Sequence, residues 1–354
     1  MRIGYSFWGF LGPGIVDTPD GGRSHRRTLI DALIDRGHNI VFLQPDRDLT
    51  EAATDLSDRY TWDAGLPDID ALMLEWRWPI PGRNITWCGA PGHTCDLHRQ
   101  AELISHYTEQ LVIPTIIWDK DRRLPAHDRL RSARNVVVCE PALHPSPGAV
   151  SLLFPVDDRR LDAADPEALS QLDRPVTLAY VGNQYDRDAA FDTFFAPAAQ
   201  PVSHVVAGKW PRTERWPQIR FTGRVAFEAV EAIHRSAVAT VLLLPERYAA
   251  VGHMTQRLFE AVLAGCLPIT PSTIRSAAWF TPVGLHAVNG ADVARICAWL
   301  TDIAGSCDHI DLLAGCVKHL DLFRASAQVR VLDRLLNEQV PATCAPFARR
   351  CRTV

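Results

Sequence analysis

Residues 240–270 read TVLLLPERYAAVGHMTQRLFEAVLAGCLPIT. The apolar runs Thr240–Leu244 and Leu267–Thr270 have the length and composition of buried strands. Between them, Thr255–Ala264 has the apolar spacing of a helix, and a Gly-Cys-Leu-Pro turn leads into the second strand. A strand, a helix and a second strand in this order predict a parallel pair of strands joined by a helical crossover. This stretch therefore predicts an α/β fold.

The same alternation of strand and helix patterns occurs in both halves of the chain, on either side of an acidic, polar stretch at residues 155–175. Such a stretch is typical of a linker between domains. We predict two Rossmann-like, doubly wound domains at residues 1–172 and 173–325, which face a central cleft. A last helix and tail at residues 326–354 are expected to pack back across both domains. The predicted strands are Arg2–Phe7, Asn39–Leu43, Ala71–Glu75, Thr115–Trp118, Asn135–Cys139, Val150–Phe154, Val176–Val181, Val202–Ala207, Arg220–Thr222, Thr240–Leu244 and Leu267–Thr270, and the clearest helices are Ser24–Arg36, Phe227–Ser236, Thr255–Ala264 and Ala327–Leu336.

The composition excludes several classes of protein. The 354 residues are 47% hydrophobic and 22% charged, which argues against disordered and fibrous proteins. A net charge of −4 gives no overall positive field, so a nucleic acid or an anionic membrane would need a local basic surface. No uninterrupted apolar run is long enough to span a membrane, and we expect a cytoplasmic protein. The nine cysteines are an odd number, which favours reduced thiols.

The loop after the first predicted strand is long and contains five glycines. Gly22 lies at its end, and His25 lies in the first turn of the helix that follows. Main-chain amides at a helix N-terminus bind anions such as phosphate, so both residues are candidates for a ligand site. Because the spacing matches neither a P-loop nor a dinucleotide fingerprint, an ordinary flexible loop fits the same residues.

The second half offers a candidate diphosphate site. Gly182 directly follows the strand that opens this half, and Arg187 begins the next helix. Arg257 and Glu260 are three residues apart and share one face of a helix. A guanidinium can hold a diphosphate while a carboxylate accepts hydrogen bonds from ribose hydroxyls. A surface ion pair between Arg257 and Glu260 is the alternative.

A longer motif contains both residues. The sequence Arg257-x-x-Glu260-Ala-x-x-Ala-Gly-x-x-Pro-Ile is similar to the donor-site motif of glycosyltransferases with the GT-B fold. This resemblance implies that Glu260 holds the nucleotide ribose and that Val225 lies in the turn that packs on the base. Lys209 lies beside a tryptophan, and such basic and aromatic pairs hold phosphates or stack on bases and sugars, although ordinary packing fits them equally.

Within this superfamily the layout resembles that of the phage DNA β-glucosyltransferases over most of the chain. The stretch Asp121–Pro125, DRRLP, follows the fourth predicted strand and carries this similarity. The resemblance implies that Asp121 is the general base that deprotonates an acceptor hydroxyl. Asp119 is the second candidate, because residues two apart in an extended chain project to the same side. Pairing of both carboxylates with adjacent basic residues is the alternative. His25 stands where that family has a glutamate.

The resemblance implies a glycosyltransferase that transfers a hexose from a UDP-sugar to a hydroxyl acceptor, with glucose as the first candidate for the hexose. The leading acceptor is a 5-hydroxymethylpyrimidine base in double-stranded DNA. A natural-product or cell-envelope acceptor is the alternative, and so is a nucleotide-sugar-binding protein without turnover. A divalent ion, Mg²⁺ or Mn²⁺, can assist departure of the diphosphate but is not required by the sequence.

Four potential metal ligands, Cys88, His93, Cys95 and His98, lie close together in the sequence. Their spacing matches no familiar zinc module, and the segment is equally typical of a loop that enters a helix. The sequence therefore predicts no metal site.

Overall fold

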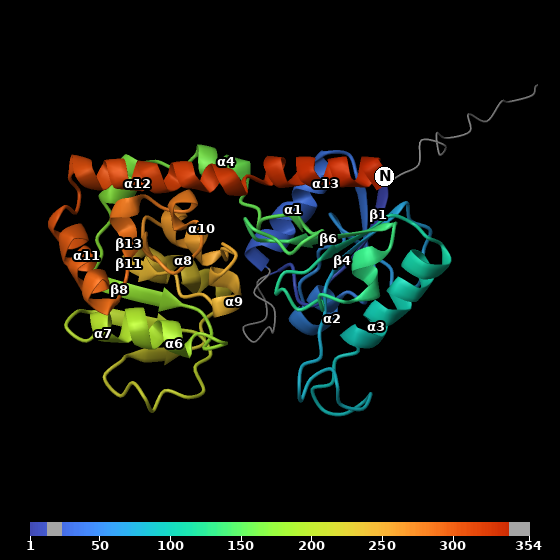
Figure 1. Ribbon diagram of the computed structural model, residues 1–354, viewed down its shortest axis with the longest axis horizontal. Coiled ribbons are helices and arrows are strands. Elements are labelled where there is room, and N and C mark those ends of the chain that lie inside the picture. Colours follow the sequence, from blue (N-terminus) through green and yellow to red (C-terminus); the bar gives the residue numbers. More distant parts are fainter. Residues whose placement is uncertain (13–22, 340–354) are drawn as a thin grey trace, which may run out of the picture.

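The computed structural model describes residues 1–12 and 23–339. It contains two β-sheets, each covered by helices, which lie side by side (Figure 1). Neighbouring strands in both sheets run parallel. The predicted α/β class with two doubly wound sheets is confirmed.

The first sheet has the strand order β3-β2-β1-β4-β5-β6-β7. The short strand β3 was not predicted, because it is a two-residue edge strand formed only by pairing with β2. The predicted strand Val150–Phe154 is shorter in the structure, since the amide of Leu153 donates to the side chain of Gln328 at 2.8 Å and not to a neighbouring strand. The strands are β1 (Arg2–Ser6), β2 (Asn39–Phe42), β3 (Thr61–Trp62), β4 (Ala71–Glu75), β5 (Thr115–Trp118), β6 (Val136–Glu140) and β7 (Val150–Ser151).

The second sheet has the strand order β10-β9-β8-β11-β12-β13. The predicted strand Thr240–Leu244 begins and ends three residues earlier, as β11. The apolar run continues to Leu244 and all of it is buried, so the sequence pattern does not mark where pairing stops. The strands are β8 (Val176–Val181), β9 (His204–Ala207), β10 (Phe221–Gly223), β11 (Ala237–Val241), β12 (Leu267–Pro271) and β13 (His286–Ala287).

Helices cover both faces of the sheets, and the four clearest predicted helices are present. The predicted linker contains two short helices, α4 and α5, whose first turns are capped by Asp157 and Asp165. The helices are α1 (Arg23–Asp35), α2 (Arg47–Ala52), α3 (Asp96–Leu103), α4 (Asp158–Asp162), α5 (Pro166–Ser170), α6 (Asp188–Ala190), α7 (Ala196–Ala199), α8 (Phe227–Arg235), α9 (Glu246–Ala249), α10 (Arg257–Leu263), α11 (Gly290–Asp302), α12 (Cys307–His319) and α13 (Ala325–Gln339). No helix in the described part of the chain has the length and apolar character needed to cross a membrane.

The chain crosses between the two sheets twice. It leaves the first sheet near Val156 and returns near Arg324, and these two residues pair as a parallel bridge. Helices α12 and α13 then lie in a row along one side of both sheets (Figure 1). Helix α13 packs on α1, and Asp333 accepts hydrogen bonds from Arg36 at 2.9 Å and from His38 at 2.8 Å. The last helix thus returns to the first sheet, while the expected tail at residues 340–354 lies outside the described residues.

Loops at the carboxyl ends of the strands join the two halves. Arg122, after β5, donates to the carbonyl of Arg247 in α9 at 2.8 Å. The amide of Leu143, after β6, donates to the carbonyl of Gly252 at 3.1 Å. The carboxyl ends of both sheets therefore meet, and in open α/β folds ligands bind at this edge.

Candidate active site

Glycines allow an arginine to lie directly on the turn after β8. A Cβ atom on Gly182 would lie 2.5 Å from Nε of Arg257, and one on Gly208 would lie 2.2 Å from the carbonyl oxygen of Gly182. Nε1 of Trp210 donates to the same carbonyl at 2.7 Å and holds the turn. The close approach therefore requires glycine at both positions. The structure brings together the predicted residues Gly182 and Arg257.

A second guanidinium lies at this edge of the sheet. Arg187 is 6% exposed, and it donates to the carbonyl oxygens of Leu243, Asn183 and Tyr185. Arg257 donates to the carbonyl of Val181 at 2.6 Å.

Neither Arg187 nor Arg257 has a carboxylate at ion-pair distance among the described residues. Burial lowers the pKa of Arg187, and the charge of Arg257 lowers it further. Buried positive charge without a counter-ion is costly, so this edge of the second sheet suits an anion.

Glu260 lies apart from the guanidinium of Arg257, although both belong to α10. In the described part of the chain the two do not form an ion pair, so the surface-pair alternative does not apply. Burial raises the pKa of the Glu260 carboxyl group, and the nearby Ser24 hydroxyl opposes the shift. It lines a cavity of about 820 Å³ between α1, α8 and α10, together with Ser24, Phe227 and Phe259. We call this space the α1–α10 cavity.

Asp121 lies at the junction of the two halves. Its Oδ1 accepts a hydrogen bond of 2.5 Å from the hydroxyl of Tyr248, which belongs to α9. Burial and the adjacent Asp121 raise the pKa of Tyr248 well above its ordinary value. Nε of Arg247 donates to the main-chain carbonyl of Asp121 at 3.3 Å, and its Nη1 pairs with Asp186 at 2.6 Å. A carboxylate from the first half is thereby held against the second half.

Asp119 has a different environment. Its side chain is fully buried and accepts hydrogen bonds from the amides of Arg123 and Leu124, each at 2.8 Å. Burial raises the pKa of Asp119 to about 6, while these two hydrogen bonds oppose the shift. Asp119 therefore shapes the loop that carries Asp121, which is the structural role that the sequence left open. Its partners are these two main-chain amides and, at 3.8 Å, the guanidinium of Arg131. No ion pair with the basic side chains adjacent in sequence is found in the described part of the chain.

The other predicted ligand residues lie in different surroundings. Val225 is partly buried in the turn between β10 and α8, and Lys209 is exposed beside the Gly182 turn. His25 is only 2% exposed, and its ring stacks on Phe154 with 4.0 Å between the ring centroids. The structure thus buries His25 against Phe154, and its ligand contact stays a prediction. Gly22 lies outside the described residues.

Sequence reasoning missed a buried charge network at the end of β4. The Glu75 carboxylate accepts two hydrogen bonds from Arg26, at 2.8 and 2.7 Å, and one from the Tyr5 hydroxyl at 2.9 Å. Lys120 pairs with the same carboxylate at 2.5 Å. The available signal was a charged residue at the end of the apolar strand ALMLE. The network fixes the carboxyl ends of β4 and β5 beside Asp121.

A second cavity, of about 740 Å³, opens at this edge of the first sheet, and we call it the β4 cavity. Trp8 lies in its lining, with the Arg47 guanidinium 4.1 Å from the ring centroid. The charged lining residues are three arginines and four carboxylates, namely Arg47, Arg77, Arg99, Glu51, Glu75, Asp96 and Glu102. The β4 cavity therefore carries no excess of positive charge.

Comparison with known proteins agrees on the fold. No protein-family model and no curated protein matches the sequence. The T4 phage β-glucosyltransferase in complex with UDP-glucose has a TM-score of 0.63 at 11% identity, over 95% of this chain and 100% of that one. AviGT4, a glycosyltransferase involved in avilamycin A biosynthesis, has a TM-score of 0.57 at 14% identity, over 96% of this chain and 97% of that one. Anabaena HepE in complex with UDP-glucose has a TM-score of 0.57 at 11% identity, over 96% of this chain and 100% of that one. This chain therefore has the two-domain GT-B fold that the sequence predicted.

Proposed function

We propose that this protein is a glycosyltransferase that transfers a hexose from a UDP-sugar to a hydroxyl acceptor, with glucose as the first candidate for the hexose. The observation that carries the proposal is the pair of guanidiniums of Arg187 and Arg257 around Gly182, which have no carboxylate partner among the described residues. A diphosphate supplies the missing negative charge in a geometry that guanidinium groups favour. The shared fold with two structures solved with UDP-glucose supports this donor.

The proposed reaction uses both halves of the molecule. Asp121 removes the proton from the acceptor hydroxyl, whose oxygen forms a bond to the anomeric carbon while the bond to the diphosphate breaks. Arg187 and Arg257 stabilise the charge of the departing UDP. Glu260 accepts hydrogen bonds from the ribose, and the hydrogen bond from Tyr248 orients Asp121.

The acceptor has two candidates. A 5-hydroxymethylpyrimidine in double-stranded DNA is supported by the likeness to the T4 phage β-glucosyltransferase, which is described as a DNA-modifying enzyme and is matched over its full length. An uncharged, hydroxylated small molecule is supported by the β4 cavity, whose lining has more carboxylates than arginines. DNA-binding surfaces are generally rich in positive charge, so this lining favours the small molecule.

Release of UDP tests donor and acceptor together. The protein is incubated with a panel of nucleotide sugars, with and without duplex DNA that contains 5-hydroxymethylcytosine or 5-hydroxymethyluracil. Release that the modified duplex stimulates supports the DNA acceptor, whereas equal release without it directs the search to small hydroxylated molecules. Binding of UDP without release from any donor contradicts the proposed transfer. Parallel reactions with Mn²⁺, Mg²⁺ or EDTA test the divalent ion, since the T4 phage enzyme has been solved with UDP and Mn²⁺.

Two variants test the donor site itself. Arg257→Ala and Glu260→Ala are expected to weaken UDP binding measured by calorimetry, because each removes a proposed contact. Arg295→Ala is the matched control, since this exposed arginine on α11 lies away from the Gly182 turn and pairs only with Asp292 among the described residues. Unchanged affinity in both donor-site variants would contradict the assignment.

A further inference from the structure

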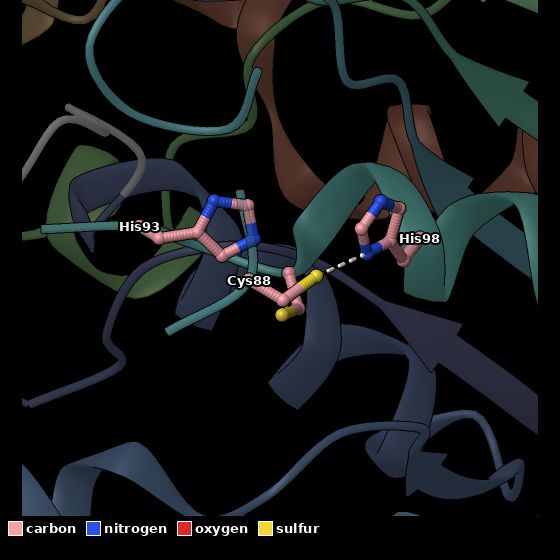
Figure 2. Close-up of side chains that lie close together, drawn as sticks. Cys88, His93 and His98 are labelled. Atoms are coloured by element: carbon pink, nitrogen blue, oxygen red, sulfur yellow. Dashed lines mark hydrogen bonds between the residues drawn. The ribbon is translucent and has the colours of Figure 1, made fainter. Parts of the chain in front are cut away.

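The loop between β4 and α3 brings four metal-binding side chains together. Cys88, His93 and Cys95 belong to this loop, and His98 lies in the first turn of α3. Their ligand atoms all lie within 4.8 Å of one another. Figure 2 shows His93 and His98 on either side of Cys88. Sequence spacing did not predict this cluster, because consecutive turns fold the loop back on itself.

The turns that build the cluster need glycine. Gly89 and Gly92 have φ values of 89° and 74°, which residues with a Cβ atom rarely adopt. The amide of His93 donates to the carbonyl of Ala90 at 2.9 Å and closes one of these turns. The amide of Thr94 donates back to the carbonyl of Arg83 at 2.9 Å. The backbone thus places the cysteines and histidines on one side of the loop.

The hydrogen bonds of His93 leave one nitrogen available. Its Nδ1 lies 2.9 Å from Oγ1 of Thr86, whose hydroxyl donates to the carbonyl of Arg83 at 3.4 Å. The Thr86 oxygen therefore accepts the Nδ1 proton, and the lone pair of His93 is on Nε2. This Nε2 atom is buried and has no hydrogen-bond partner in the described part of the chain. A metal-binding histidine has this arrangement, with the second ring nitrogen fixed by a hydrogen bond.

The spacing of the ligand atoms fits a tetrahedral ion. Bonds of about 2.3 Å to sulfur and about 2.0 Å to nitrogen place tetrahedral ligand atoms about 3.3–3.8 Å apart. Sγ of Cys88 and Nδ1 of His98 already lie 3.3 Å apart. The widest separation, 4.8 Å, needs a contraction of about 1 Å by side chains that are mostly exposed.

The loop has little else to hold it. Ile85 is 55% exposed and Trp87 is 72% exposed, so apolar burial contributes little to this segment. A metal ion bound by four side chains supplies folding free energy that such a segment lacks. Two cysteines and two histidines are a ligand set that favours Zn²⁺, and four protein ligands leave no open position for catalysis.

We propose that Cys88, His93, Cys95 and His98 bind one structural Zn²⁺ that fixes the loop between β4 and α3. Cys95 and His98 also line the β4 cavity, so the ion holds one side of the space that would receive the acceptor. The acceptor role of the β4 cavity rests on the proposed function, whereas binding of the ion is independent of glycosyl transfer.

Metal content of the full-length protein tests the proposal. The protein is purified in reductant without a metal-affinity step, and elemental analysis is expected to find one zinc per chain. Replacement by Co²⁺ is expected to give the absorption of a tetrahedral site with thiolate ligands. Zinc-free protein that does not bind added Zn²⁺, or a disulfide between Cys88 and Cys95 in place of the ion, would overturn the proposal.

Variants locate the ion. Cys88→Ser and His98→Gln are expected to lose zinc, whereas Cys307→Ser keeps it, because Cys307 is an exposed free cysteine outside the cluster. Full zinc content in both cluster variants would contradict the assignment. The measurements on the wild-type protein decide the question if a variant does not fold.

Hydrogen exchange separates this proposal from the proposed function. Chelation of the zinc is expected to increase exchange in residues 76–95, while UDP affinity at the second sheet stays unchanged. Unchanged exchange after removal of the ion would contradict the structural role. Absence of UDP release from protein with one zinc per chain contradicts the proposed function alone.

Discussion

The Gly182 turn gives a sharp test of the donor site through a single added methyl group. In Gly182→Ala the new Cβ would lie 2.5 Å from Nε and 2.6 Å from Nη2 of Arg257, so the guanidinium has to move. The main-chain turn is held by Trp210 and leaves the arginine as the part that yields. The substitution therefore displaces the group proposed to hold the diphosphate without changing any charge.

The size of the effect follows from the contact that is lost. A hydrogen bond to a charged group contributes about 1.5–3 kcal/mol. Each 1.4 kcal/mol corresponds to a tenfold change in affinity, so UDP binding is expected to weaken about 10- to 100-fold. Calorimetric titration of UDP measures this change, and thermal unfolding checks that the protein stays folded. Gly284→Ala is the matched control, because a Cβ there meets only a ring carbon of Trp299 at 3.8 Å.

A double-mutant cycle decides whether Gly182→Ala acts through Arg257. In an Arg257→Ala background, the added methyl group is expected to change UDP affinity by less than about twofold, because the group that it displaces is already absent. Equal losses in the two backgrounds would refute the reasoning, and so would unchanged affinity in Gly182→Ala alone.

Three further variants test the first half of the molecule. Asp121→Asn is expected to abolish sugar transfer while UDP affinity stays unchanged, and normal turnover would remove Asp121 from the role of base. Asp119→Asn is expected to remove a pH dependence of the unfolding free energy, measured by urea titration. Because the pKa of Asp119 is raised from 3.8 to about 6, the stabilisation by its protonated form is present below pH 3.8 and is lost as the pH rises through about 6. This component is on the order of 3 kcal/mol, and an unchanged slope in Asp119→Asn would contradict it. Glu75→Gln leaves Arg26 and Lys120 buried without their shared carboxylate and is expected to cost about 3–5 kcal/mol of stability, so a change below about 1 kcal/mol would argue against the network.

The sequence predicted the strands well because most of them are short apolar runs with turn residues at both ends. It failed where tertiary contacts decide the outcome. Strand β3 exists through its pairing with β2, and the predicted strand at Val150–Phe154 shortens because Leu153 bonds to Gln328, which is 175 residues away. No local pattern contains such a partner.

In the candidate site too, the sequence identified residues, while contacts between distant parts of the chain determined their surroundings. Arg257 was a candidate from its place in a known motif and Gly182 from its place directly after a strand, and the structure brings the two into contact. The resemblance ranked Asp121 before Asp119, but the residues alone do not distinguish them. Both follow the same strand, and only the fold shows that Asp119 is the one whose side chain is fully buried. The burial of His25 could not be predicted either, because its ring stacks on Phe154, 129 residues away. Local spacing identifies candidate residues, whereas burial assigns their roles.

The paired crossing between the halves determines how they can move. The amide of Val156 donates to the carbonyl of Phe323 at 2.7 Å, and the amide of Ala325 donates to the carbonyl of Val156 at 2.8 Å. The two connecting segments are therefore one hydrogen-bonded hinge and not two independent tethers. We expect any rotation between the halves to take place about this shared connection, which such a rotation leaves intact. A single proteolytic cut in either segment leaves the halves attached through the other.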